Sequence, residues 1–312
     1  MNRSRARRGS VEDMGPGDES KGALGEVLAR PRYEVFPAKG AEDLVDSLPK
    51  EAKVTVTCSP TRGIESTLLL TERLAERGLQ VVPHISARLV ADKEHLEGIV
   101  RRLDDLGVRE IFVIGGDAKK PVGPFSGAFE LLYAMADMGH NFEHVGIAGY
   151  PEGHPVIGDA ALHRALRDKL PFATYIVSQM CFDPRTIVDW VVDIRRREIQ
   201  LPVIVGVPGV VDKKRLFRVS RRIGVGDSAR FLKKHTNLTM SLFASLFKSG
   251  GYSPDGLVRE LAPYVGDRDR NIIGFHVYTF NQIESTEKWR RRMLHPGEGT
   301  TAPRREGSGG HL

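Results

Sequence analysis

The feature that most constrains this chain is a repeating alternation of short apolar runs with longer amphipathic segments. Short runs rich in β-branched residues are typical of buried strands, and apolar residues three or four positions apart are typical of helices that cover a core. The runs predict strands at 32–36, 54–58, 80–84, 110–114, 146–149, 173–178, 202–207 and 271–278. The amphipathic segments predict helices at 41–47, 68–74, 93–106, 129–138, 160–170, 187–197, 212–222 and 284–293.

This alternation predicts a parallel α/β fold, because parallel neighbours must be joined by a crossover, usually a helix. Eight strand-helix units favour a closed (β/α)8 TIM barrel. An open doubly wound sheet is the alternative, but Pro37 follows the first predicted strand where that fold carries its glycine-rich nucleotide fingerprint. We therefore expect a single barrel domain over residues 31–294, interrupted by an insertion at 224–256, with disordered tails at 1–30 and 295–312.

Composition limits the classes of function open to this chain. Its 312 residues carry a formal net charge of +6, but much of the excess arginine lies in the two predicted tails. We expect these tails to be solvated rather than to bind nucleic acid, because the body of the chain shows no RNA-binding signature. No apolar run is long enough to cross a membrane, no signal peptide is recognisable, and Cys58 and Cys181 form no disulfide framework. These features favour a cytoplasmic protein with small-molecule partners, and they leave its oligomeric state open.

In a (β/α)8 barrel, the active site lies at the carboxyl ends of the strands. The stretch 146–155 shows this most clearly, since an apolar run ends at Pro151 and the polar residues Glu152 and His154 follow at once. An ordinary βα turn is the simpler alternative for this stretch taken alone. Other predicted strands end in the same way, and the residues at their ends are Glu34, Thr57, His84, Asp117, Gln179 and Tyr278 to Asn281.

Glu34 is the candidate acid of this set. Its apolar neighbours predict partial burial, which would raise the pKa of the carboxyl group and let it donate a proton near neutral pH. Gln179 lies at the end of an apolar strand and needs a hydrogen-bonding partner, either a neighbouring side chain or a ligand amide. We expect no metal site, because His84 and His154 lack the spacing of metal ligands. The whole set suits a flat, amide-rich heterocycle.

Several stretches resemble the methylenetetrahydrofolate reductase family, and the resemblance runs from about residue 33 to residue 289. They are Tyr33-Glu34-Val35-Phe36-Pro37, Gly116-Asp117, Gly149 to Pro155, Ser178 to Asp183 and Phe275 to Asn281. Each motif alone is weak, and their order and spacing make the match specific. The resemblance implies a barrel that reduces 5,10-methylenetetrahydrofolate to 5-methyltetrahydrofolate, with hydride from NADH or NADPH carried by FAD. Such a reaction supplies methyl groups for methionine synthesis.

The resemblance also implies a role for each matching residue. Glu34 would be the general acid that helps to open the methylene bridge, and Gln179 would bind the pterin edge. Asp117 would hydrogen-bond the pterin and tune the charge of the hydride donor. Tyr278 and Gln282, in the final motif, would contact the folate substrate. The flavin-contacting positions would be Thr57, His84, Gly116, Asp117, Ala148, His154 and Lys169.

The chain departs from the family pattern at positions expected to hold the tails of the cofactor and of the substrate. Gly115 stands where the family has the arginine of its Arg-Gly-Asp motif, and Gln282 stands where it has an arginine that binds folate. The spacing from His154 to Lys169 is also shorter than in the family. We therefore hypothesise that FAD binds weakly or not at all, and that hydride passes directly from the nicotinamide to the methylene carbon.

Two other kinds of function fit the same set of residues. A tetrahydrofolate-dependent methyl transfer or demethylation would need no nicotinamide. A non-catalytic folate or flavin sensor would tolerate Glu34→Gln, whereas loss of a general acid typically costs about 10²–10⁴-fold in rate. Neither NADH nor NADPH is favoured as the hydride donor, because no ribose-reading acid or arginine is identifiable.

Overall fold

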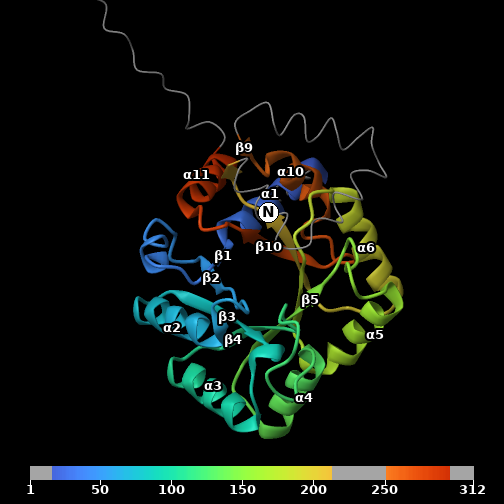
Figure 1. Ribbon diagram of the computed structural model, residues 1–312. Helices are drawn as coiled ribbons and strands as arrows, with labels where there is room; N and C mark the ends of the chain where they lie inside the picture. Colours follow the sequence, from blue (N-terminus) through green and yellow to red (C-terminus); the bar gives the residue numbers. More distant parts are fainter. Residues whose placement is uncertain (1–15, 213–250, 296–312) are drawn as a thin grey trace, which may run out of the picture.

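The computed structural model describes residues 16–212 and 251–295, which form a closed barrel of parallel strands with helices around it (Figure 1). The barrel strands are β1 (Arg32–Val35), β2 (Lys53–Val56), β3 (Gln80–Ser86), β4 (Glu110–Ile114), β5 (His144–Gly149), β6 (Tyr175–Ser178), β7 (Val203–Pro208) and β10 (Ile272–Tyr278). They follow one another around the barrel in the order β1-β10-β7-β6-β5-β4-β3-β2, and β1 closes the ring by pairing with both β10 and β2. The predicted (β/α)8 TIM barrel is confirmed.

Helices lie outside the ring, where their apolar faces cover the strands (Figure 1). They are α2 (Gly63–Glu76), α3 (Lys93–Asp105), α4 (Ala128–Met138), α5 (Asp159–Lys169), α6 (Pro184–Arg196), α10 (Asp255–Leu261) and α11 (Ile283–Leu294). Two of them begin at an aspartate side-chain cap, because Asp92 accepts from the His95 backbone at the start of α3 and Asp183 accepts from the Arg185 backbone at the start of α6. Among the described residues, no helix is both long enough and apolar enough to cross a membrane.

The N-terminal segment differs from the expectation of a disordered tail over residues 1–30. Helix α1 (Pro16–Ala29) lies within it and contacts β10, α11 and the 3₁₀ turn η4 (Ala262–Tyr264). Leu28 is 4% exposed in the core, with Leu24 and Val27 packed beside it. These residues are three and four positions apart, so they share one helix face whose burial offsets the cost of ordering the segment. Residues 1–15 and 296–312 lie outside the described part of the chain.

A shorter element replaces one predicted helix. The helix expected at 41–47 is only a 3₁₀ turn, η1 (Ala41–Asp43), and a further turn follows it, closed by a hydrogen bond from the Leu48 backbone nitrogen to the Val45 backbone oxygen. Further 3₁₀ turns are η2 (Ala87–Leu89) and η3 (Leu170–Phe172). Nearly all of the helix expected at 212–222 and most of the insertion expected at 224–256 lie outside the described residues. The description resumes with β9 (Gly251–Tyr252), antiparallel to β8 (Val211–Asp212).

Alternate residues of each strand point into the barrel, and they form layers of different chemistry. Near the amino-terminal ends of the strands, Glu110 forms ion pairs with Arg32 and Lys53. An apolar layer fills the middle of the barrel and consists of Val82, Phe112, Tyr175, Val177 and Ile204. Glu34 on β1 lies two positions after Arg32, so it belongs to the layer nearest the carboxyl ends. The barrel therefore keeps Glu34 apart from the ion pairs beneath it.

Candidate active site

Glu34 lies near the carboxyl end of β1 and is only 5% exposed. Its Oε2 lies 3.0 Å from Nε2 of His276 on β10 and 4.0 Å from Nε2 of His84 on β3. Closure of the barrel produces this arrangement, because β1 and β10 pair with Glu34 opposite Tyr278 although the chain separates them widely. The burial that the sequence predicts for Glu34 is confirmed.

Burial disfavours the charged forms of all three residues in this cluster. It raises the pKa of Glu34 to about 7, an increase that the nearby His84 partly offsets. The same burial lowers the pKa of His84 to about 4 and that of His276 to about 3. Both imidazoles are therefore mostly neutral near pH 7, and the attraction of His84 lowers the pKa of Glu34 less than burial raises it. A carboxyl group in this setting can hold a proton near neutral pH and donate it to a bound base, as a general acid must.

Tyr278 connects the Glu34 cluster to Gln179. Its ring packs edge-on against the ring of His276, with centroids 4.8 Å apart. Its hydroxyl oxygen lies 3.3 Å from the backbone oxygen of Ser178 and 3.4 Å from Oε1 of Gln179, and it can donate to either. Burial raises the pKa of Tyr278, so the hydroxyl remains a donor. The structure thus brings Glu34, Tyr278 and Gln179 to one side of the barrel mouth.

Side chains in the turn after β10 hydrogen-bond to the backbone at the end of β1. Asn281 Oδ1 accepts from the backbone nitrogen of Phe36 at 2.8 Å, and Asn281 Nδ2 donates to the backbone oxygen of Phe36 at 3.1 Å. The Thr279 hydroxyl donates to the backbone oxygen of Glu34. Asn281 has a φ of 58°, a left-handed conformation that asparagine adopts more readily than most residues. The sequence placed Thr279 and Asn281 among the residues at the strand ends and His276 within the final motif, but it indicated no individual role for any of the three.

Asp117 follows β4 and is exposed at the rim of the barrel. Burial raises the pKa of Tyr150, and the charge of Asp117 adds to this effect. Burial lowers the pKa of His154, and Asp117 opposes the change. The rings of Tyr150 and His154 meet edge-on at 5.3 Å, and Tyr150 also raises the pKa of Tyr278. Asp117 follows β4, and Tyr150 and His154 follow β5, so the three residues lie at the carboxyl ends of two neighbouring strands.

Three predicted flavin-contacting positions line the same end of the barrel. Thr57, after β2, has a buried hydroxyl with no hydrogen-bond partner among the described residues. Gly116, after β4, has a φ of 89°, and a Cβ there would lie 1.9 Å from the hydroxyl oxygen of Ser86, so only glycine fits. Ala148, on β5, packs against the apolar layer of the barrel. Together with His84, these three residues offer backbone atoms and small side chains to a flat ring that approaches this end of the barrel.

Two predicted site residues lie away from this cluster. Lys169 is the last residue of α5, at the helix end that leads to the start of β6, and burial lowers its pKa to about 8. Since α5 rises by about 1.5 Å per residue from the barrel rim, Lys169 lies far below it. Gln282 Nε2 donates to Oδ2 of Asp212 at 2.7 Å, and the Asp212 backbone nitrogen donates to Gln282 Oε1 at 3.3 Å. The side chain of Gln282 therefore joins two loops and does not reach the Glu34 cluster.

An apolar wall borders the cluster on the side of β1, β6 and β10. It consists of Phe36, Met180, Phe182, Val211, Tyr252, Tyr278 and Phe280. Cys181 is buried next to this wall, and burial raises the pKa of its thiol, so it is an unreactive lining residue. Apolar walls with a few convergent polar groups are typical of sites for small flat ligands.

The Glu34 cluster also has the composition of a metal site. The ligand atoms of Glu34, His84 and His276 all lie within 4.8 Å of one another, and no second group of this kind occurs in residues 16–212 and 251–295. Sequence spacing could not indicate such a site, because its members come from three strands far apart in the chain.

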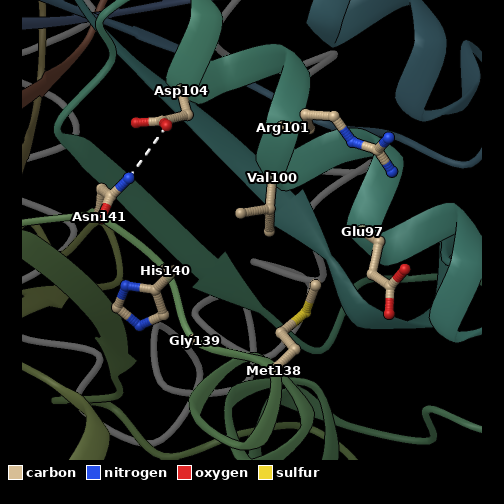
Figure 2. Close-up of a pocket in the computed structure, with 8 residues that line it drawn as sticks. All are labelled: Glu97, Val100, Arg101, Asp104, Met138, Gly139, His140 and Asn141. Atoms are coloured by element: carbon tan, nitrogen blue, oxygen red, sulfur yellow. Dashed lines mark hydrogen bonds between the residues drawn. The ribbon is translucent and has the colours of Figure 1, made fainter.

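A hollow at the opposite end of the barrel has a different character (Figure 2). It is lined by the C-terminal part of α3 and by the segment between α4 and β5, and it contains Glu97, Arg101, Asp104 and His140. Asn141 Nδ2 donates to Asp104 Oδ2 at 3.0 Å, so part of this lining is already paired (Figure 2). None of the predicted site residues lies there.

Comparison with known proteins agrees with the geometry of the barrel mouth. The family model described as methylenetetrahydrofolate reductase matches residues 33–237, which is more than half of the chain and includes Glu34, Asp117 and Gln179. Methylenetetrahydrofolate reductase 1 of Schizosaccharomyces pombe is 28% identical over 123 residues, a match that covers 36% of this chain and 20% of that relative. The similarity thus spans about a fifth of the relative's length. On this family match and this barrel, the chain belongs to the methylenetetrahydrofolate reductase family.

Proposed function

We propose that this protein reduces 5,10-methylenetetrahydrofolate to 5-methyltetrahydrofolate with hydride from NADH or NADPH, and so supplies methyl groups for methionine synthesis. The observation that carries the proposal is Glu34, a buried carboxyl group whose pKa is raised to about 7, at the carboxyl end of a barrel strand in a chain of this family. Both cysteines are free and buried, which supports a reducing compartment such as the cytoplasm.

In this reaction Glu34 donates its proton to the bridging nitrogen that leaves when the five-membered ring opens. The other nitrogen then forms an iminium with the methylene carbon, and that carbon accepts hydride from the nicotinamide. One hydride and one proton are consumed, the folate is reduced, and the nicotinamide is oxidised. A neutral acid suits this task, because the site stays uncharged until the cation forms and the carboxylate left behind stabilises it.

The neighbouring groups would hold the pterin in place. Gln179 offers an amide that can hydrogen-bond the pterin edge, and Tyr278 holds that amide from the side of Glu34. Asp117 lies exposed across the mouth, where it can accept hydrogen bonds from the pterin. The apolar wall would exclude water from the methylene carbon. Orientation of this kind is worth several kcal/mol when two substrates must meet.

FAD is the cofactor that the family implies, and when bound it would carry hydride between the two substrates. The chain offers Thr57, His84 and Ala148 to a flat ring, but the matched lysine, Lys169, lies at the far end of α5 and Gly115 supplies no cation. The positions matched to the tail of the cofactor therefore do not fit it. We propose that FAD binds weakly or not at all, and that hydride passes directly from the nicotinamide to the methylene carbon in a ternary complex.

One experiment tests these proposals together. The absorption spectrum of the purified full chain is recorded, and NADH and NADPH oxidation is then followed without oxygen, with and without methylenetetrahydrofolate. We expect a colourless protein whose nicotinamide oxidation depends on the folate. Stoichiometric flavin absorbance would overturn the direct transfer of hydride. Nicotinamide oxidation that does not depend on the folate would overturn the reductase. No oxidation with either nucleotide would also overturn it, and would favour methyl transfer or a sensor.

A further inference from the structure

The strongest unexplained feature of the described chain is the nitrogen of His84 that faces Glu34. His84 is 4% exposed, and its Nε2 is buried without a hydrogen-bond partner among the described residues. Buried polar atoms are nearly always paired, because an unpaired one loses its interaction with water and gains nothing in return. This nitrogen lies 4.0 Å from Oε2 of Glu34, too far for a hydrogen bond and close enough to share a third partner.

The surroundings of this nitrogen have the spacing of a metal site with three protein ligands. Nε2 of His276 lies 3.0 Å from the same Glu34 oxygen, and all three ligand atoms lie within 4.8 Å of one another. In a tetrahedral zinc site, metal–ligand bonds of about 2.0–2.2 Å place neighbouring ligand atoms about 3.3–3.6 Å apart. The two separations from the Glu34 oxygen, 3.0 and 4.0 Å, bracket that value, and no pair of ligand atoms is more than 4.8 Å apart. Side-chain rotations that draw the ligand atoms together would complete the site.

The two imidazoles are held in place by packing. The ring of His84 meets the ring of Phe112 edge-on at 4.8 Å, and the ring of His276 meets the ring of Tyr278 edge-on at 4.8 Å. Ligands that are already oriented lose little freedom when an ion binds. Two histidines and one carboxylate form a ligand set that zinc and other divalent transition metals accept, with one coordination position left for water.

We propose that Glu34, His84 and His276 bind one divalent transition-metal ion of the zinc type, and that this ion takes the place of the proton on Glu34 and so inhibits the enzyme. The binding step stands on the geometry alone, whereas the inhibition rests on the proposed function. The exchange is balanced, since the carboxyl group releases one proton to solvent and its oxygen then bonds the ion. A metal-bound Glu34 has no proton to donate to the methylene bridge.

Metal binding can be measured without any substrate. The full chain is treated with a chelator, desalted and titrated with Co²⁺, whose visible absorption reports coordination, and Zn²⁺ is then added to displace it. Wild type should bind one equivalent of either ion. His84→Ala and His276→Ala should each weaken binding by at least about 100-fold, because even outer partners of metal ligands are worth about 10–100-fold. His140→Ala, in the hollow of Figure 2, is the matched control and should bind as wild type does.

Circular dichroism shows whether the histidine variants are still folded. Glu34→Gln keeps the shape of its side chain, so weaker metal binding by this variant would reflect the loss of a ligand and not the loss of the fold. Binding that is absent in wild type, or equal in wild type and in both histidine variants, would overturn the site. Zn²⁺ should abolish folate-dependent nicotinamide oxidation, and a chelator should restore it. Zn²⁺ bound in one equivalent without loss of turnover would overturn the inhibition. A chain that binds Co²⁺ but never oxidises nicotinamide would instead contradict the proposed function and leave the metal site standing.

Discussion

Replacing Glu34 by glutamine removes the proposed acid and preserves nearly everything else about the site. The amide has the same shape as the carboxyl group, and its oxygen can still accept from Nε2 of His276, which lies 3.0 Å from Oε2 in the native protein. What it lacks is a proton that it can donate near neutral pH. The variant therefore isolates proton donation from folate binding.

The expected loss follows from the role of the residue. General acid catalysis is worth about 10²–10⁴-fold, which corresponds to about 3–5 kcal/mol of the activation barrier. We expect this loss in kcat, with folate affinity within about threefold of wild type, because a proton transferred only in the transition state contributes little to ground-state binding. Single-turnover oxidation of NADH gives the rate, and calorimetry with tetrahydrofolate gives the affinity. Glu143→Gln, an exposed substitution before β5, is the control and should keep full activity.

The same variant makes a prediction about stability. Because burial raises the pKa of Glu34 from 4.5 to about 7, folding favours its protonated form, and wild type loses this contribution as pH rises through that range. Relative to Glu34→Gln, the wild-type free energy of unfolding should fall by roughly 3 kcal/mol between pH 4.5 and pH 8. The free energies of unfolding of wild type and Glu34→Gln must be subtracted at each pH. The lowered pKa values of His84 and His276 make both proteins more stable as pH rises over part of this range, and the subtraction removes that effect. Turnover of Glu34→Gln close to that of wild type would contradict a role for Glu34 as the acid. A difference in stability that does not change with pH would contradict its raised pKa.

Three further predictions concern the surroundings of Glu34. The kcat/KM of wild type should decline above about pH 7 as Glu34 loses its proton, and an unchanged value up to pH 9 in a stopped-flow titration would contradict this. Gly116→Ala should lower the free energy of unfolding in urea by at least about 2 kcal/mol, since its Cβ would lie 1.9 Å from the Ser86 hydroxyl at a φ of 89°. Gly139→Ala is the control. Its Cβ would have nothing within 4 Å, so its free energy of unfolding should fall only by the strain of a φ of 80°. Asn281→Ala should lower the free energy of unfolding by about 2–3 kcal/mol and reduce kcat, because the backbone nitrogen and oxygen of Phe36 both lose their partner. Asn281→Gly loses the same two hydrogen bonds but adopts the φ of 58° without strain. It should therefore recover only the strain that alanine adds there.

Much of the fold follows from local sequence signals. Buried parallel strands read as apolar runs, so strands such as Glu110–Ile114 are recognisable without any tertiary information. Helix α1 was missed because its glycines and acidic residues suggest a tail, although Leu24, Val27 and Leu28 carry the spacing of one helix face. The stability of α1 comes from packing against α11 and β10, which no local pattern reveals.

In the site too, some features follow from the local sequence and others depend on the tertiary structure. Burial of Glu34 could be predicted, because its neighbours along the strand are apolar. The contacts of Glu34 with His84 and His276 could not, because they depend on how β1 closes against β10 and on the inward alternation of three separate strands. The expectation for Lys169 failed for a different reason. A match to a position of the family does not say which end of a helix the residue occupies.

The protonation state of Glu34 can be measured by infrared spectroscopy of the carboxylic acid carbonyl, as the spectrum of wild type minus that of Glu34→Gln. The difference spectrum isolates one carboxyl group from the other acids of the chain. We expect a protonated carbonyl band at pH 6 that disappears with a midpoint near pH 7, as burial raises the pKa of Glu34 to about 7. A band already absent at pH 6 would show an ionised Glu34 and contradict its role as the proton donor.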